Sequence, residues 1–205
     1  MRHATFSIVI PTYNRFESLK RLLISLTKVK YAGQFDIHII ENGPEQSARA
    51  LLPQFQKLLS IHYHYTAIRG TAHARNIGIT ASDKQYILCL DDDVVVQPGI
   101  LTAYDEAWKR YPGYTILGGG IHARKEDGTE WSEQEKKVLA KYGWCAAHQP
   151  SPEVDTILQL SELLFSANMS FKRTKEMRFN ERLGRPFYGE TWVMAEDYEL
   201  CYSTM

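Results

Sequence analysis

The chain has 205 residues with 44% hydrophobic side chains, and its 24 basic residues (Lys and Arg) balance its 24 acidic residues (Asp and Glu). This length and composition predict one globular domain with a substantial core. The balanced charge excludes an overall electrostatic field that would attract nucleic acid or an anionic membrane, so any anionic ligand must be held by a local site.

Cysteine usage and hydropathy indicate the compartment. Cys89, Cys145 and Cys201 are widely spaced, which argues against a disulfide framework or a thiolate zinc site, and we expect them to be packing groups in a reducing cytoplasm. No apolar run approaches the roughly 18 residues of a membrane span, and residues 1–5 lead into a strand rather than a signal-peptide core. We therefore expect a cytoplasmic protein, with peripheral association at the inner face of the membrane left open.

Strands and helices alternate along the first half of the chain. Apolar runs predict strands over residues 6–10, 35–40, 61–65, 86–90 and 115–117. Apolar residues at helical spacing predict helices after residue 14, over about 46–59, after residue 70 and over about 100–110. Asn14 and Glu17 have the spacing of a capping box for the first helix, and Thr71 is a candidate cap for the third. Units of this length imply right-handed crossovers and a parallel sheet.

The regular alternation stops in the second half. Residues 122–155 are polar, contain Trp131 and Trp144, and have helical spacing only over about 134–139. This segment is expected to pass over the carboxyl edge of the sheet, either as a lid or as a variable surface insertion. Regular structure is predicted again over residues 163–171, and a last helical segment opens at residue 196.

Three consecutive carboxylates, Asp91, Asp92 and Asp93, directly follow the apolar run of residues 86–90. Ligands of open α/β sheets bind at the carboxyl ends of strands, where such a cluster can hold a divalent cation against a phosphate. A helix cap is the alternative explanation, but it needs only one carboxylate. Because three crowded carboxylates repel one another unless a cation or strong donors compensate, the pattern favours a metal site.

Separated motifs along the whole chain occur in one order that is typical of a single family. They are residues 7–15 (SIVIPTYNR), Arg75-Asn76-x-Gly78, Leu90-Asp91-Asp92-Asp93, Ala167-Asn168-Met169 and Glu196-Asp197-Tyr198-Glu199-Leu200. The chain resembles the family-two glycosyltransferases. This resemblance implies the GT-A fold of the nucleotide-diphospho-sugar transferases, an α/β class with a mostly parallel, Rossmann-like central sheet flanked by helices and a carboxyl-terminal acceptor-side portion.

The resemblance also implies an activity and its partners. We expect a metal-dependent, inverting transfer of a sugar from a nucleoside-diphosphate sugar, UDP-linked, to the hydroxyl of a glycan or lipid-linked acceptor in surface polysaccharide or glycan biosynthesis. The cofactor is Mn²⁺ or Mg²⁺, and no nucleic acid is involved. Residues 1–205 form one domain, with about 1–120 as the nucleotide-sugar half and about 121–205 as the acceptor and catalytic half. Only eight residues follow Asp197, whereas the family usually continues, so the chain is either a truncated form or lacks those elements.

Roles for the strand-end carboxylates follow from the same resemblance. Asp91 and Asp93 lie at the ribose and the metal, and Asp93 is the direct metal ligand. Asp92 occupies a position that the family varies, where its side chain faces solvent or the donor sugar.

The nucleoside pocket is assigned in the same way. Pro11, Thr12 and Tyr13 form its wall at the end of the first strand. Glu41 stands where the family usually carries Asp to accept a hydrogen bond from the base, and its longer side chain keeps that acceptor. Arg75 matches an arginine that binds base carbonyl or phosphate oxygens, with a surface ion pair as the alternative.

Asp197 and Glu196 are the candidate catalytic carboxylates. Asp197 is the base that takes the acceptor proton, and Glu196 orients or binds the acceptor. The alternative is that both only complement the charge of a helix N-terminus.

Other function classes are less well supported. A non-catalytic relative that binds nucleotide or glycan without turnover remains open, whereas a sugar-nucleotide-forming nucleotidyltransferase needs a Gly-rich loop that residues 11–15 do not provide. His62 and His64 could form a metal pair, but alternating polar positions on a half-solvated edge strand explain them more simply. Residues 118–120, three glycines, mark a close backbone approach near the donor sugar or an ordinary loop.

Overall fold

The computed structural model describes residues 2–125, 129, 131–142, 164–182 and 200. Within these residues the strands are β1 (Phe6–Thr12), β2 (Phe35–Glu41), β3 (Ile61–Tyr65), β4 (Tyr86–Leu90), β5 (Ile116–Gly118) and β6 (Asn168–Lys172). The helices are α1 (Phe16–Leu26), the 3₁₀ helix η1 (Ser47–Leu51), α2 (Leu52–Phe55), α3 (Thr71–Ala81), α4 (Ile100–Arg110) and α5 (Glu133–Tyr142).

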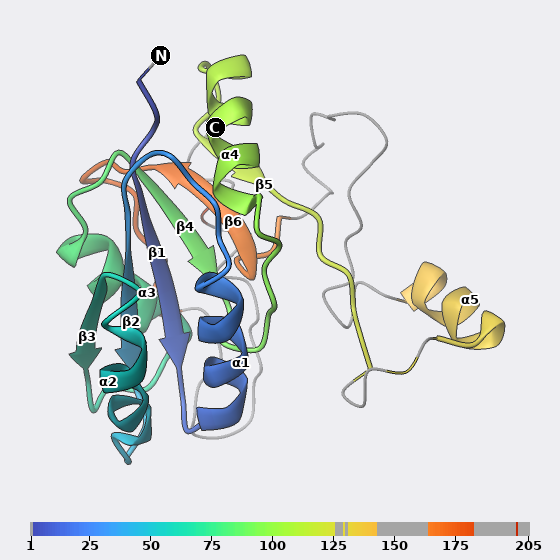
Figure 1. Ribbon diagram of the computed structural model, residues 1–205, viewed down its shortest axis with the longest axis horizontal. Coiled ribbons are helices and arrows are strands. Elements are labelled where there is room, and N and C mark those ends of the chain that lie inside the picture. Colours follow the sequence, from blue (N-terminus) through green and yellow to red (C-terminus); the bar gives the residue numbers. More distant parts are fainter. Residues whose placement is uncertain (1, 126–128, 130, 143–163, 183–199, 201–205) are drawn as a thin grey trace.

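The described strands form one sheet in the order β3-β2-β1-β4-β6-β5 (Figure 1). Strand β1 pairs in parallel with β2 and β4, and β2 pairs in parallel with β3. Strand β6 runs antiparallel to both β4 and β5. The predicted α/β class with a mostly parallel sheet is therefore confirmed. Every residue of β1 and β4 is buried, as expected for strands that are covered on both faces.

Two apolar clusters, one on each face of the sheet, make up the core. On one face, Phe6, Ile8 and Ile10 pack with residues of α1, η1, α2 and α4. On the other, Val9 and Ile40 pack with α3 and with β6. Side chains alternate along β1, so Ile8 and Ile10 lie in the first cluster and Val9 lies in the second.

The segment predicted as one helix over residues 46–59 is instead η1 followed by the short α2. Pro53 explains the difference, because it has no backbone N–H to donate and is tolerated only in the first turn of a helix. The second helix therefore has to begin next to Pro53.

Both predicted helix caps are wrong. Helix α1 begins at Phe16 after Arg15, without a side-chain cap, and Asn14 has a left-handed φ of 51°. Helix α3 is preceded by Gly70 in an extended left-handed conformation (φ 138°), so Thr71 lies inside the helix. In each case the residue at the N-cap position is not the predicted one, and it makes no side-chain hydrogen bond to the helix N-terminus.

The second half agrees with the prediction in part. Strand β5 and α5 lie where short regular elements were expected, and β6 overlaps the predicted segment 163–171 and extends one residue beyond it. Figure 1 shows α5 standing to one side of the sheet. A Cβ at Gly118 or Gly119 would collide with Leu164 or Asn168, so the backbone does approach other groups closely there. None of the helices in the described part of the chain has the length and hydrophobicity to cross a bilayer.

Candidate active site

The carboxyl ends of β2, β1 and β4 lie side by side and bring the predicted site residues to one edge of the sheet. Thr12, the last residue of β1, pairs in register with Glu41, the last residue of β2. Asp91 follows directly after β4, which is the other neighbour of β1. The order of strands in the sheet, rather than their order in the chain, creates this edge.

Asp92 is only 4% exposed and faces the turn after β1. Its Oδ2 accepts a hydrogen bond from Thr12 Oγ1 (2.7 Å), and its Oδ1 accepts one from Arg15 Nη1 (2.9 Å). Burial raises the pKa of Asp92, and these two donors oppose the rise. The expectation that Asp92 faces solvent is wrong. Its buried carboxylate instead hydrogen-bonds Thr12 and Arg15, and so links the end of β4 to the end of β1 and the turn after it. A contact with the donor sugar stays a prediction.

Asp91 and Asp93 differ from Asp92 because their side chains are 38% and 48% exposed. Each forms an ion pair with an arginine. Arg75 Nη2 donates to Asp91 Oδ1 (2.9 Å), and Arg15 Nη1 donates to Asp93 Oδ2 (2.8 Å). A carboxylate oxygen bonded to one donor can still accept another bond or coordinate a cation. The two predicted metal ligands are therefore accessible.

Arg75 is buried in α3 and pairs with Asp91, so the alternative is correct in expecting an ion pair and wrong in placing the arginine at the surface. Its guanidinium carbon lies 5.1 Å from the centre of the Phe179 ring, and its Nη2 reaches Asp91. A buried, permanently charged group beside the strand-end carboxylates is well suited to bind an anion, since little water screens it.

Glu41 is fully buried and accepts hydrogen bonds from three protein groups. Its Oε1 accepts from the Ala48 backbone N–H (3.0 Å) and the Ser47 hydroxyl (3.2 Å), and its Oε2 accepts from the Tyr63 hydroxyl (2.7 Å). Burial and the bond to Glu41 raise the pKa of Tyr63. Glu41 therefore holds the start of η1 through Oε1. Within the described residues Oε2 accepts one hydrogen bond, from Tyr63, so a hydrogen bond from a base would be the second one to this oxygen.

The turn after β1 has an aromatic surface. Pro11 and Thr12 are buried, whereas Tyr13 is half-buried, and the guanidinium carbon of Arg69 lies 5.2 Å from the centre of the Tyr13 ring. A flat ring with a cation beside it matches the predicted role of residues 11–13 as a pocket wall.

Two site residues were part of recognised motifs but had no predicted role. Arg15 joins Asp92 to Asp93, and Asn76 hydrogen-bonds the Phe179 backbone through both amide atoms. These partners are 77 to 103 residues away in the chain, which no local pattern indicates.

The sequence matches the model of a known protein family. The model described as "Glycosyl transferase family 2" matches residues 7–182, most of the chain. The chain belongs to glycosyl transferase family 2. This membership confirms the resemblance that the motifs indicated.

Among the curated relatives of this family-two chain, the chondroitin synthase of Escherichia coli is 30% identical over 102 residues, which are 49% of this chain and 15% of that protein. The poly-beta-1,6-N-acetyl-D-glucosamine synthase of Staphylococcus epidermidis is 26% identical over 121 residues, 58% of this chain and 29% of that protein. The chain thus spans less than a third of the length of these relatives.

Solved structures share the fold. S. aureus TarS 1–349 in complex with UDP-GlcNAc has a TM-score of 0.69 and 17% identity, covering 100% of this chain and 53% of that one. The mannosyltransferase PcManGT from Pyrobaculum calidifontis, in complex with GDP-Man and Mn²⁺, has a TM-score of 0.64 and 14% identity, covering 100% of this chain and 52% of that one. These similarities establish the GT-A fold of the family-two chain.

The predicted catalytic pair, Glu196 and Asp197, lies outside the described residues. The assignment of the base therefore stays a prediction, as do the expected lid and the division of the chain into two halves.

Proposed function

We propose that this chain binds a UDP-linked sugar and transfers the sugar to the hydroxyl of a glycan or lipid-linked acceptor in surface polysaccharide synthesis. The observation that carries the proposal is the pair of accessible carboxylates, Asp91 and Asp93, at the sheet edge beside the buried Arg75. Two relatives are named as polysaccharide synthases, and TarS was solved with UDP-GlcNAc, which supports this class of donor and product.

Asp93, with Asp91 beside it, would hold Mn²⁺ or Mg²⁺. Accessible carboxylate oxygens are the donors that these hard cations prefer, so the residues fit the metal. When bound, the cation supplies positive charge that neutralises the diphosphate. Arg15 pairs with Asp93 through Oδ2, so the charge of this guanidinium opposes a cation bound to the same carboxylate.

The nucleoside would lie between the β1 turn and the end of β2. Tyr13 provides a flat surface for the base or ribose, and Glu41 Oε2 accepts from the imino N–H of uracil. Cytosine has no N–H at that ring position, so CDP would lose this hydrogen bond to a charged acceptor, a difference of about 1.5–3 kcal/mol. Arg75 binds a carbonyl or phosphate oxygen.

Asp197 would act as the base on the face of the sugar opposite the diphosphate, with Glu196 positioning the acceptor. The acceptor oxygen forms a bond to the anomeric carbon while its proton passes to Asp197. The bond between that carbon and the diphosphate oxygen breaks, and the diphosphate leaves with the electron pair. A single displacement of this kind inverts the anomeric configuration.

Calorimetric titration of UDP in the presence and absence of Mn²⁺ tests donor binding. We expect Mn²⁺ to strengthen UDP binding to the wild type, Asp93→Asn to abolish that gain, and CDP to bind more weakly than UDP. Glu106→Gln, which removes an exposed carboxylate of α4, is the matched control. Equal UDP affinity with and without Mn²⁺, or equal affinity of wild type and Asp93→Asn, would refute the metal assignment.

Turnover tests the base separately. In a form of the protein that transfers sugar, Asp197→Asn is expected to lower the rate by about 10²–10⁴-fold while metal-dependent UDP binding stays unchanged. An undiminished rate would exclude Asp197 as the base, and a product with retained configuration would exclude single displacement.

A further inference from the structure

A second group of polar side chains lies on β2 and β3, away from the carboxyl ends of the strands. Asp36 and His38 come from the first half of β2, and His62 is the register partner of His38 on β3. Asp36 precedes Glu41 by five residues, or roughly 16 Å along a strand. The group therefore lies toward the opposite end of the sheet from the proposed nucleotide site.

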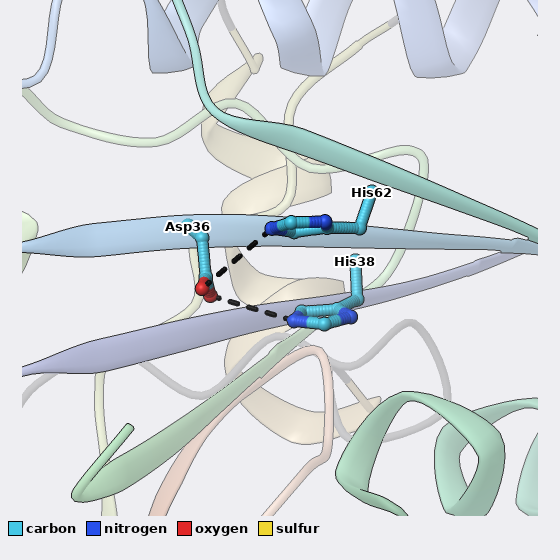
Figure 2. A group of neighbouring side chains, drawn as sticks. All are labelled: Asp36, His38 and His62. Atoms are coloured by element: carbon cyan, nitrogen blue, oxygen red, sulfur yellow. Dashed lines mark ion pairs between the residues drawn. The ribbon is translucent and has the colours of Figure 1, made fainter. Parts of the chain in front are cut away.

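The three side chains converge, as Figure 2 shows. His38 Nε2 lies 3.5 Å from Asp36 Oδ1, His62 Nε2 lies 3.9 Å from Asp36 Oδ2, and the three potential ligand atoms lie within 4.8 Å of one another. A tetrahedral zinc ion with bonds of about 2.0–2.1 Å separates its ligand atoms by roughly 3.3–3.4 Å. Small side-chain adjustments would bring the three atoms to that spacing.

Two atoms in this group are buried and lack a hydrogen bond. Asp36 Oδ1 and His38 Nε2 have no hydrogen-bond partner in the described part of the chain. A proton shared between them would draw them to about 2.7–3.0 Å, but they are 3.5 Å apart. Buried polar atoms are almost always paired, so this arrangement calls for a group that satisfies both, and a cation does so.

Neighbouring residues orient the ligands in the way that metal sites require. His38 Nδ1 lies 3.1 Å from His64 Nε2, within hydrogen-bond distance. With the proton on Nδ1, His38 Nε2 presents a lone pair toward Asp36. Lys84 Nζ contacts Asp36 Oδ2 at 3.1 Å, so Oδ2 already has a cationic partner and Oδ1 is the oxygen left for a metal.

We propose that Asp36, His38 and His62 bind a divalent transition metal of the zinc class. Two imidazoles and one carboxylate suit Zn²⁺, and they distinguish this site from the all-carboxylate site at Asp91 and Asp93. The group borders an open cavity of about 630 Å³ that is also lined by Ser60 and other residues. Three protein ligands would leave a tetrahedral ion one position for water or a small ligand. The metal also links the edge strand β3 to β2.

Titration of the intact chain with Zn²⁺ and with Co²⁺ tests this proposal. We expect one ion per chain and the visible absorption of tetrahedral cobalt. His62→Gln is the informative variant, because the His62 side chain is 52% exposed and its loss leaves the core intact. Removal of this ligand is expected to weaken Zn²⁺ binding by at least about tenfold and to abolish the cobalt absorption.

Two controls separate this site from other histidines and from the strand-end carboxylates. His122→Gln, at an exposed histidine outside the group, and Asp93→Asn should both keep Zn²⁺ affinity and the cobalt spectrum. Zn²⁺ should raise the melting temperature of both controls but not that of His62→Gln. The proposal is overturned if the wild type gives no tetrahedral cobalt signal, if His62→Gln binds Zn²⁺ as the wild type does, or if Asp93→Asn loses the site. None of these outcomes depends on UDP binding or sugar transfer.

Discussion

The side-chain amide of Asn76 makes two hydrogen bonds to the backbone of Phe179. Asn76 Nδ2 donates to the Phe179 carbonyl oxygen (2.8 Å), and Asn76 Oδ1 accepts from the Phe179 N–H (2.9 Å). The Phe179 ring in turn packs against the guanidinium of Arg75, the residue before Asn76. Through these contacts with Phe179, Arg75 and Asn76 connect the segment of residues 164–182 to the candidate site.

Asn76→Ala should therefore destabilise the fold and loosen the site. It leaves two buried backbone groups of Phe179 without partners, at about 1–3 kcal/mol for each unsatisfied group. We also expect weaker UDP binding, because the ring over Arg75 loses its anchor. Urea unfolding and calorimetry measure the two effects. Gln54→Ala, which removes an exposed amide of α2, should stay within about 0.5 kcal/mol of wild type, and an equal loss in both variants would contradict the anchoring role.

Arg15→Gln should strengthen the binding of Mn²⁺ alone. The Arg15 guanidinium lies 2.8 Å from Asp93 Oδ2, so its positive charge opposes a cation bound to the same carboxylate. Two unit charges at about 4 Å in water interact by roughly 1 kcal/mol, which corresponds to about a fivefold gain in affinity. Titration of Mn²⁺ without nucleotide measures this gain. Arg21→Gln, an exposed arginine on α1, should leave the affinity unchanged, and unchanged or weaker binding by Arg15→Gln would show that the ion pair does not compete.

Gly78→Ala should destabilise the protein even though alanine is the better helix former. A Cβ at Gly78 would lie 2.6 Å from Val9 Cγ1 and 2.8 Å from Ile40 Cδ1, where α3 meets the sheet. We expect overpacking of about 1–3 kcal/mol to exceed the gain in helix propensity of about 1 kcal/mol. Denaturant unfolding measures the difference. Gly113→Ala, in an exposed turn where an added Cβ has no neighbour within 4 Å and φ is not positive, should not be destabilised. A stabilised Gly78→Ala would mean that α3 can move away from the sheet.

Asp105→Asn should remove a pH-dependent part of the stability. The buried Asp105 accepts hydrogen bonds from Lys109 Nζ (2.8 Å), His3 Nδ1 (2.9 Å) and the Ala4 N–H (3.1 Å). Burial raises the pKa of Asp105, but these partners outweigh it and hold the pKa below its usual value. A lowered pKa means that the stabilisation is complete above the unfolded value of about 3.9 and is lost as the pH falls through the folded value.

The stability difference between wild type and Asp105→Asn is accordingly expected to be about 1–3 kcal/mol at pH 7 and to shrink below about pH 4. Urea unfolding at several pH values gives the curve, with Glu106→Gln on the same helix as the control. A difference that stays constant with pH would show that the ionised form of Asp105 is not the stabilising one.

Local patterns were sufficient for most of the regular structure. The strands Ile61–Tyr65 and Tyr86–Leu90 and the helix Ile100–Arg110 begin and end where they were predicted. In these segments the apolar spacing and the flanking polar residues agree with the tertiary packing. The prediction failed over residues 46–59, where Pro53 interrupts backbone hydrogen bonding although the apolar spacing continues.

The sequence by itself determined the family, the α/β class and the presence of carboxylates at a strand end, because these depend on motifs and spacing within short segments. Only the tertiary structure decided that Asp92 is buried while its neighbours are accessible, since Thr12 and Arg15 reach it across the sheet. The group of Asp36, His38 and His62 depends on the same kind of information. His62 reaches the other two only through the pairing of β2 with β3, and the register of two strands is set by contacts between distant segments of the chain.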